Sequence, residues 1–348
     1  MARPARPARG ATIVDVASRA GVSSMTVSRV INGRPGVSDE TRSVVHEAIK
    51  ALSYTPNVAA RNLVTSSELR IGVIYSNASA AFMSEFLTGV FEEASARGAR
   101  LILLKGKDGH PPTVEALDEL LATGLSGALL APPLGEASEV LGTLRKADCA
   151  MAAVGAYQAP STICVRIDDR AAAYQMTRLL LDKGHRRLGF ILGNPDQAAS
   201  AERMAGFYAA VRETGGVDVQ VVQGDFTYMS GLVAAEQLLN LPHPPTAIFA
   251  SNDDMAAAVV SVAHRRHLDV PGELTVAGFD DTTVAHTIWP PLTTVHQPVR
   301  DLAAQALGLL IAEIAAKGGK SRVPRETILD HAIVERQSTG EPSSSTPS

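Results

Sequence analysis

Polar side chains with complementary hydrogen-bonding abilities follow several apolar segments in the larger, carboxyl-terminal part of the sequence. Asn252 follows residues 247–251, and Asp280 follows residues 274–279. A carboxylate accepts hydrogen bonds, the guanidinium of Arg203 donates them and an amide does both, so such a set can chelate adjacent hydroxyl groups of a sugar. The candidates are Ser76, Asn77, Asp168, Asp169, Arg203, Asn252, Asp253, Asp280 and Asp281, together with the aromatic Phe226.

Each polar candidate also has a simpler explanation as a helix cap. Asp and Asn are preferred immediately before a helix because their side-chain oxygens accept the first free backbone N–H groups. Several polar groups at one edge of a sheet indicate more than capping, and Phe226 offers a flat apolar face to a sugar ring. We therefore interpret the set as a binding site for a small polyhydroxylated ligand.

Catalysis is the main alternative, because paired carboxylates occur in glycoside hydrolases. The pairs at 168/169 and 280/281 are adjacent residues, however, and adjacent residues in a turn generally point apart. The sequence contains no Gly-x-Ser-x-Gly elbow, no Walker loop and no Gly-x-Gly-x-x-Gly after its first apolar segment. The histidines are scattered, as solvated or backbone-bonded histidines usually are. We predict no catalytic residue, no metal ligand and no cofactor.

These candidates need a scaffold, and the sequence from residue 70 onward predicts one. Short apolar segments alternate with longer segments of helical periodicity, as in parallel sheets covered by helices on both faces. This order predicts two doubly wound α/β subdomains, with a ligand cleft between the carboxyl ends of their strands. Strands are expected at residues 71–75, 101–104, 127–131, 188–192, 219–222, 247–250 and 274–278, and helices at 82–97, 113–123, 200–214, 230–240 and 255–267.

The amino-terminal part of the sequence predicts three short helices. Thr12 opens a capping-box sequence for a first helix that ends at Gly21, and Ser23 can cap a second helix that ends before Gly33. Two helices joined by a tight Gly-Val-Ser turn form a helix-turn-helix. The expected core positions are Val16, Ala17, Ala20, Val22, Val27, Val30, Ile31, Val44, Val45, Ala48, Ile49 and Leu52.

The second helix leaves a row of short or fork-shaped side chains outside this core. Such side chains fit the major groove of DNA, where arginine can donate to O6 and N7 of guanine. Outward Ser and Thr are also common as plain capping or solvated residues, so the motif alone leaves both interpretations open. The outward residues are Ser24, Met25, Thr26, Ser28 and Arg29.

The distribution of charge favours DNA binding. Residues 1–65 carry nine Lys and Arg residues against four acidic ones, a net charge of +5, whereas the rest of the chain carries −9 and the whole chain −4. A basic segment joined to a larger acidic body is typical of a nucleic-acid-binding module.

The LacI/GalR family of bacterial repressors begins with a sequence that resembles residues 12–32 here, TIVDVASRAGVSSMTVSRVIN. Residues 54–63, YTPNVAARNL, are similar to that family's hinge helix, and the likeness continues to about Arg336. It implies that the hinge folds on operator DNA, where Leu63 inserts into the minor groove beside Ala60; a plain linker is the alternative. The DNA-binding residues predicted are Thr12, Ile13, Ser23, Ser24, Met25, Thr26, Ser28, Arg29, Asn32, Tyr54, Asn57, Ala60 and Leu63.

The resemblance also implies roles in the cleft. Arg203 bridges ligand hydroxyls, Asn252 supplies an amide, Asp280 a carboxylate and Phe226 a stacking face, while Gln297 reaches the cleft from a crossover strand. The loop after the first strand departs from the commoner Asn-Pro-Phe pattern. The effector-binding residues predicted are Ser76, Phe82, Met83, Asp169, Arg203, Phe226, Asn252, Asp280 and Gln297.

The length of 348 residues leaves room for a small head and two further domains. We expect a disordered basic arm at residues 1–11, the helix-turn-helix domain at 12–56, a hinge helix and linker at 57–68, a two-lobed effector-binding and dimerisation domain at 69–336 and a disordered tail at 337–348. The body is expected to resemble periplasmic binding proteins. Its first lobe takes residues 69–161 and 293–324, and its second lobe takes 162–292 and 325–336.

Together these features predict a ligand-responsive repressor of carbohydrate uptake or catabolism genes. A homodimer on a palindromic operator of double-stranded DNA doubles the contacts of a single head, and a sugar or sugar derivative is the expected effector. An effector other than a sugar, or a two-lobed solute-binding protein without a role in transcription, remain the alternatives. Whether the effector induces or corepresses stays open.

The remaining expectations concern the location and state of the chain. No stretch approaches the length of a membrane span, and the first residues lack the apolar core of a signal peptide, so we expect a bacterial cytoplasmic protein, at the nucleoid when bound. Cys149 and Cys164 have neither metal-ligand nor redox-pair spacing and are expected to be buried thiols. No heptad repeat follows Arg336, so no tetramerisation coil is predicted.

Overall fold

The computed structural model describes residues 13–31, 37–52, 69–76, 79–107, 110–157, 159–316 and 324–343. The chain divides into two compact units, residues 1–68 and 69–348, which are called the head and the body below. Within the described ranges, no helix has both the length and the apolar composition needed to cross a membrane.

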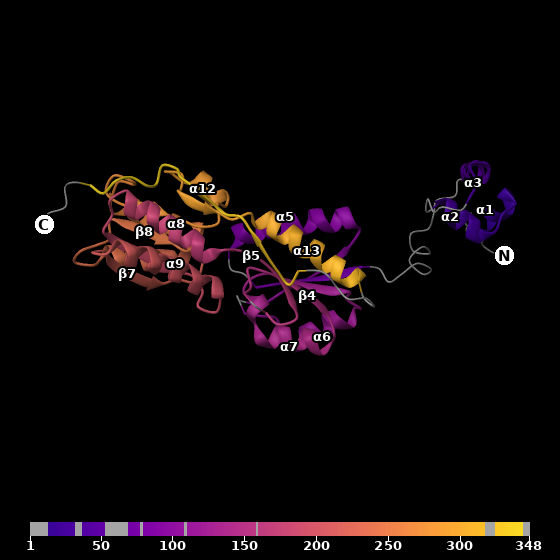
Figure 1. The fold of residues 1–348 in the computed structure, drawn as a ribbon, viewed down its shortest axis with the longest axis horizontal. Helices are drawn as coiled ribbons and strands as arrows, with labels where there is room; N and C mark the ends of the chain where they lie inside the picture. The colour runs from indigo at the N-terminus through magenta and orange to yellow at the C-terminus, as the bar shows by residue number, and fades with distance from the viewer. Residues whose placement is uncertain are drawn as a thin grey trace, which may run out of the picture. The chain divides into compact units, whose positions relative to one another are not determined.

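The described residues of the head form the helices α1 (Ile13–Ala20), α2 (Ser24–Ile31) and α3 (Asp39–Ala51), labelled in Figure 1. Val16, Val27 and Val45 are fully buried at the centre of its core. The prediction that Ser23 caps α2 is confirmed, because its Oγ accepts a hydrogen bond from the N–H of Thr26 at 3.1 Å. The head therefore has the predicted helix-turn-helix arrangement.

One core position of the head was predicted wrongly. The side chain of Val44 is 42% exposed, whereas its neighbour Val45 is fully buried. Consecutive residues of a helix point about 100° apart, so only one of the two can face a core of this size. Thr12 and Gly33, the expected ends of the first two helices, and the side chain of Ile31 lie outside the described residues.

The first lobe of the body is built on a six-stranded parallel sheet in the order β11-β5-β4-β3-β1-β2. Two helices cover each face, α5 and α13 on one side and α6 and α7 on the other, as Figure 1 shows. The elements are β1 (Arg70–Tyr75), α5 (Ala80–Arg97), β2 (Arg100–Lys105), α6 (Val114–Ala122), β3 (Gly127–Leu130), η1 (Leu134–Glu136), α7 (Ser138–Lys146), β4 (Ala150–Val154), β5 (Thr162–Ile167), α13 (Val299–Ala315) and β11 (Glu326–Leu329).

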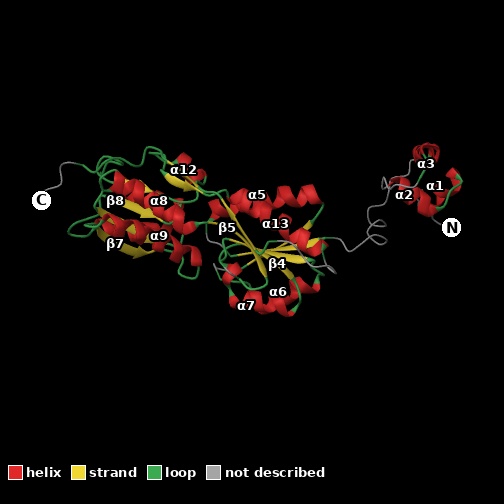
Figure 2. Cartoon of the chain, viewed as in Figure 1, coloured by secondary structure: helices red, strands yellow, loops and turns green. Residues whose placement is uncertain are grey.

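The second lobe has a four-stranded parallel sheet in the order β7-β6-β8-β9. Phe190 of β6 stacks on Phe207 of α9 with ring centroids 4.7 Å apart, which packs α9 on one face, while the core around Ile191 packs α10 and α11 on the other. Figure 2 shows α8 and α9 beside the labelled strands β7 and β8. The elements are α8 (Asp169–Asp182), β6 (Arg187–Leu192), α9 (Ala198–Thr214), β7 (Asp218–Gln223), α10 (Tyr228–Leu239), β8 (Ala247–Ala250), α11 (Asp253–Arg265), β9 (Thr275–Ala277) and α12 (Thr283–Thr287).

The predicted fold class, an all-α helix-turn-helix head with a body of two parallel α/β lobes, is confirmed. The predicted strand at residues 101–104 differs in one respect, since β2 is half exposed rather than buried on both faces. It lies at the edge of its sheet, where a strand has only one paired neighbour.

The chain passes between the lobes three times. It leaves the first sheet after β5, returns between β10 (Thr294–His296) and α13, and leaves again between β11 and β12 (Ala332–Val334). β10 and β12 pair antiparallel, and β10 also bridges to Asp280 of the second lobe. The predicted lobe boundaries are therefore shifted, because β5 and β11 pair within the first sheet and β10 adjoins the second.

The prediction of a disordered tail from residue 337 is wrong for residues 337–343. Ser338 is fully buried, where its Oγ donates to the carbonyl of Val276 at 2.6 Å and accepts from the N–H of Thr293 at 2.8 Å. The carbonyl of Gly340 lies 3.0 Å from Nε2 of the buried His185. Ser338 and Gly340, which lie in a segment that the sequence predicts to be solvent-exposed, thus form hydrogen bonds inside the second lobe. Residues 344–348 lie outside the described residues.

Candidate functional site

Residues from both lobes converge on one cleft, at the carboxyl ends of the strands. The open space between them is about 40 Å³. One water takes roughly 10–15 Å³ and a small-molecule pocket roughly 300–1,000 Å³, so the lobes must separate to admit a ligand. The lining residues are Ser79, Phe82, Pro132, Val154, Gly155, Ile167, Asp169, Gln197, Ala199, Arg203, Phe226, Asn252, Asp280 and Gln297.

Arg203 of α9 is the only cation among these lining residues, and its side chain is almost fully buried. Its Nε donates to Oδ1 of Asp169 at 2.8 Å, and its Nη1 donates to the carbonyl of Ser251 at 2.5 Å. The guanidinium carbon lies 3.6 Å from the ring centroid of Phe279, and Nη1 lies 4.0 Å from Oδ1 of Asp280. A planar guanidinium suits this combination of stacking and forked hydrogen bonding better than an ammonium group.

Asp280 follows β9 in a backbone conformation that L-residues rarely adopt, with a φ of 109°. Its Oδ1 accepts a hydrogen bond from Nε2 of Gln297 at 2.7 Å. Burial raises the pKa of Asp280 well above its ordinary value, and the nearby Arg203 only partly offsets this effect. A buried carboxyl that retains a proton can donate as well as accept, which is useful toward ligand hydroxyls.

Adjacent acidic residues point in different directions, as predicted. Asp169 faces the cleft, whereas Asp168 accepts from the N–H of Ala171 at 2.9 Å and caps α8. Asp280 faces the cleft, whereas Asp281 accepts from Nη2 of Arg336 at 2.5 Å. Neither adjacent pair therefore presents both of its carboxylates to the cleft.

Asp253 supports the turn that carries Asp280 and does not line the cleft. Its Oδ2 accepts from the N–H of Thr282 at 2.8 Å, and its Oδ1 accepts from the Oγ of Thr294 at 2.6 Å. Burial raises the pKa of Asp253 to about 7, despite these hydrogen bonds, which act to lower it. A carbon placed as Cβ on Gly278 would lie 2.4 Å from Oδ1 of Asp253, so the turn and the carboxylate are closely packed.

Asp253→Asn is expected to remove part of the pH dependence of stability. An acid whose pKa is raised on folding contributes stability below its unfolded pKa, and this contribution is lost as the pH rises through about 7. The parent should therefore lose up to about 4 kcal/mol between pH 4 and pH 8 that the variant does not lose. Urea unfolding of both proteins at pH 4 and pH 8 measures this. The same difference in stability at both pH values would contradict the assignment.

Asn252 both caps α11 and positions the aromatic side of the cleft. Its Oδ1 accepts from the N–H of Met255 at 3.0 Å, and its Nδ2 donates to the carbonyl of Phe226 at 2.9 Å. Phe226 has a φ of 71°. A Cβ on Gly193 would lie 2.0 Å from the Phe226 ring, so the ring packs flat against a backbone without a side chain. Asn252 therefore both caps α11 and lines the cleft.

The loop after β1 contributes to the cleft through residues that differ in part from those predicted. Phe82 lines the cleft, whereas Met83 is buried in the core and the lining includes neither Met83 nor Ser76. Ser79, which the sequence analysis missed, lines the cleft, caps α5 and donates from its Oγ to Oδ2 of Asp254 at 2.7 Å. A serine three residues before an apolar helical segment was the available signal. Asn77 lies outside the described residues.

The predicted DNA-binding residues of α2 lie on the face of the head away from its core. Ser23, Ser24, Met25 and Arg29 are exposed, with Met25 at 69%, and the half-buried Thr26 has its Oγ1 2.9 Å from the Oγ of Ser23. Thr12, Asn32, Tyr54, Asn57, Ala60, Leu63 and the side chains of Ile13 and Ser28 lie outside the described residues.

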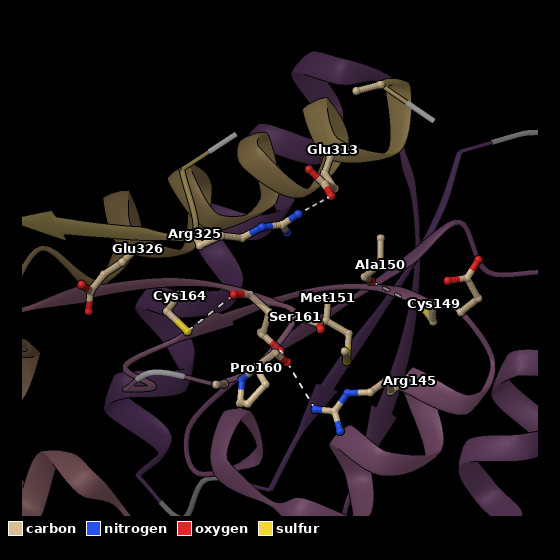
Figure 3. Close-up of a pocket in the computed structure, with 14 residues that line it drawn as sticks. Arg145, Cys149, Ala150, Met151, Pro160, Ser161, Cys164, Glu313, Arg325 and Glu326 are labelled. Carbon is tan, nitrogen blue, oxygen red and sulfur yellow. Dashed lines mark hydrogen bonds and ion pairs between the residues drawn. The ribbon is translucent and has the colours of Figure 1, made fainter. Parts of the chain in front are cut away.

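A larger hollow of about 790 Å³ lies at the opposite edge of the first sheet, beside the starts of β4 and β5 (Figure 3). Three of its charged side chains bond to the protein, since Arg325 Nη2 lies 2.8 Å from Glu313 Oε1 and Arg145 donates to the carbonyl of Pro160 at 3.2 Å. Ligands of parallel sheets bind at the carboxyl ends of strands, which favours the cleft.

Both cysteines line this hollow, Cys164 buried and Cys149 half-buried. Burial raises the pKa of the Cys164 thiol, so its reactive thiolate form is disfavoured. In the described parts of the chain, no three His, Cys, Asp or Glu side chains are grouped so as to hold a metal ion.

Comparison with known proteins gives consistent matches to both units. Residues 12–57 match the family of bacterial regulatory proteins described as the lacI family, and residues 177–339 match the periplasmic binding protein-like domain. Catabolite control protein A of Priestia megaterium is 34% identical over 332 residues, covering 94% of this chain and 99% of that protein.

Solved structures match in the same way. A transcriptional regulator described as a CelR–cellobiose complex has a TM-score of 0.70 and 30% identity, covering 96% of this chain and 100% of that one. The lac repressor dimer bound to operator and the anti-inducer ONPF has a TM-score of 0.78 and 27% identity, covering 95% and 100%.

Proposed function

Because the chain belongs to the LacI family of bacterial regulatory proteins, we propose that it is a transcriptional repressor that binds a palindromic operator as a homodimer and responds to a small sugar or sugar derivative in the interlobe cleft. The observation that carries this proposal is the buried Arg203, placed between Asp169 and Asp280 at the junction of the two lobes. We propose that its target genes serve carbohydrate uptake or catabolism and that it acts in the cytoplasm, at the nucleoid when bound to DNA.

The chemistry of the cleft supports a ligand rich in hydroxyl groups. Asp169 and Asp280 offer acceptors, Arg203 and Gln297 offer donors, and Phe226 offers an apolar face, which together match the alternating edges and faces of a sugar ring. The CelR structure contains cellobiose, which supports the same class of effector. The relatives reported above are regulators of transcription, so we propose that these residues bind and do not catalyse.

Exposed apolar side chains on the body support a homodimer. Phe91 of α5 and Leu103 of the edge strand β2 are exposed in the first lobe, and Tyr228, Met229 and Val233 of α10 are exposed in the second. Met229 and Val233 lie one turn apart on α10, and neighbouring exposed apolar side chains are typical of interaction surfaces. The lac repressor structure is described as a dimer, and a dimer of this chain would present two heads to the two half-sites of an operator.

The order of the elements supports coupling between the cleft and the head. β1, an inner strand of the first sheet, begins at Arg70, directly after the segment that leads from the head. A ligand that changes the angle between the lobes moves the first lobe relative to the second, and the first lobe can pass that change to the hinge segment and the two heads. Leu63 as a wedge in the minor groove remains a prediction of this scheme.

Arg29→Ala tests the DNA-binding part of the proposal. Arg29 is exposed on α2, where a guanidinium can read guanine in the major groove. The variant should lose about 1–3 kcal/mol on an operator selected from random duplexes and lose specificity as well. Fluorescence anisotropy with operator and with unrelated DNA measures both effects.

The matched control is Arg42→Ala, which removes the same charge from α3 and should weaken any binding evenly on both DNAs. If Arg29→Ala binds the operator as tightly as the parent does, α2 does not read bases through this residue.

A further inference from the structure

Glu136, at the end of η1 in the first lobe, joins the two lobes through a single carboxylate. Its Oε1 accepts from the N–H of Tyr157, in the loop after β4 of the same lobe, at 3.0 Å. Its Oε2 accepts from the N–H of Ala198, the first residue of α9 in the second lobe, at 2.8 Å. No motif in the sequence marks this residue, because its partners are backbone groups distant in the chain.

The helix that Glu136 reaches has no side-chain cap from its own lobe. The residue before α9 is Gln197, which makes no capping hydrogen bond. Three other helices that begin at the cleft are capped by their own lobe, α5 by Ser79, α8 by Asp168 and α11 by Asn252, whereas α13, which begins just after Gln297, has no side-chain cap either. The first N–H groups of a helix carry partial positive charge and need hydrogen-bond acceptors. Glu136 of the first lobe supplies a side-chain acceptor to α9, which Gln197 of the second lobe does not.

The position of Glu136 is fixed by the packing of η1 on β4. Leu134 is fully buried, and a Cβ on Gly135 would lie 2.6 Å from the Cβ of Ala153 and 2.7 Å from that of Ala156. Because η1 packs this closely on its own lobe, we expect it to move with that lobe when the lobes separate. Separation of the lobes therefore breaks the hydrogen bond between Glu136 and Ala198.

The second hydrogen bond of Glu136 leads to the same part of the cleft. Tyr157, whose backbone Glu136 holds, donates from its hydroxyl to Oδ2 of Asp169 at 2.8 Å. The guanidinium of Arg166 lies 4.1 Å from the centroid of the Tyr157 ring. Asp169 accepts from Arg203 through its other oxygen, so Glu136 acts on the Arg203–Asp169 pair through both α9 and Tyr157.

We propose that Glu136 is a positioning residue for the effector site, which latches the lobes together and holds the Arg203–Asp169 pair in place. The regulatory meaning of this latch rests on the proposed function, in which the angle between the lobes controls binding to DNA. An effector that enters a cleft of about 40 Å³ must first release Glu136 from α9.

A thiol placed in the wall of the cleft tests the latch without a ligand or DNA. Val154 lines the cleft on the rigid strand β4 and is 1% exposed, so the rate at which N-ethylmaleimide labels Val154→Cys reports opening of the lobes. The full-length protein is used, with Cys149 and Cys164 replaced by Ser and Ala. Glu136→Ala should raise this rate by about tenfold or more, since loss of a charge-assisted hydrogen bond shifts an equilibrium by at least that factor.

The control is Glu139→Ala, which removes an exposed carboxylate from the start of α7, close to Glu136 in the chain. It should leave the labelling rate unchanged. Equal rates for Glu136→Ala and the parent, or an equal rise in both variants, would overturn the proposal.

A second variant keeps the test decisive if Glu136→Ala does not fold. Glu136→Gln preserves the size of the side chain but retains one accepting oxygen for two N–H donors, so its labelling rate should lie between those of the parent and Glu136→Ala. A rate equal to that of the parent would again overturn the latch. Because neither DNA nor a ligand is present, this failure is separate from failure of the repressor proposal, which Arg29→Ala decides.

Discussion

Replacement of Arg203 by alanine should lower the stability of the body by about 3–5 kcal/mol, because it leaves buried carboxylates without their cation. Asp169 loses a hydrogen bond of 2.8 Å, the carbonyl of Ser251 loses its donor, and Asp280 loses the nearest positive charge. Denaturant unfolding of the parent and the variant measures the loss. A thermal-shift screen of mono- and disaccharides first identifies a sugar that binds the parent. Calorimetric titration should then show no binding of this sugar to the variant. The affinity of the free variant for operator should be unchanged.

The double variant Arg203→Ala/Asp280→Asn distinguishes charge from packing. Asp280→Asn removes one of the two buried acidic groups beside Arg203. The double variant should therefore regain part of the stability lost by Arg203→Ala. A double variant that is less stable than Arg203→Ala by the full cost of Asp280→Asn alone would show that the two side chains act independently. Unchanged binding of the sugar by Arg203→Ala would exclude the cleft as the effector site.

Gly206→Ala should damage the same pair by forcing two helices apart. Gly206 of α9 packs on the backbone of α8, where an added Cβ would lie 2.1 Å from the carbonyl oxygen of Arg170 and 2.9 Å from the N atom of Tyr174. These are backbone atoms, so the helices must separate, at a cost of about 1–3 kcal/mol or more. Asp169 begins α8 and Arg203 lies on α9, so sugar binding should weaken as well.

The matched control is Gly142→Ala on α7. No atom lies within 4 Å of the Cβ added there, so this variant should be unchanged or gain up to about 1 kcal/mol from better helix propensity. Thermal and urea unfolding compare the two variants. Equal stability of Gly206→Ala and Gly142→Ala would show that the contact between α8 and α9 tolerates a side chain.

The elements that could be located most closely from the sequence are strands whose burial on both faces determines their apolar sequence. β6 and β8 are apolar on both faces because helices cover both sides of the second sheet, and the predicted strands match them closely. β4 was not predicted. Its sequence, Ala-Met-Ala-Ala-Val, has little of the β-branched and aromatic character that identifies a strand, although all but its first residue are buried.

The candidate site was predictable as far as one rule reaches. Polar residues that follow parallel strands meet at one edge of a sheet, and Asp169, Asn252 and Asp280, which come after strands, do line one cleft, together with Arg203 of α9. The rule does not predict which residues of one lobe contact the other lobe. Ser79 and Glu136 were missed because their partners, Asp254 and the N–H of Ala198, belong to the opposite lobe and become neighbours only when the lobes meet.

The number of chain segments that join two parts of the protein determines whether those parts can be exchanged between relatives. A single segment of chain leads from the head to the body, so a head could be transplanted onto another body by one splice near residue 68. The lobes are joined by three separate passages, and two of them lie beside cleft residues, after β5 at Asp169 and after β10 at Gln297. Neither lobe is a continuous piece of sequence. New operator preferences can therefore arise by recombination of gene segments, whereas new effector preferences in this chain must arise by point substitution within the cleft.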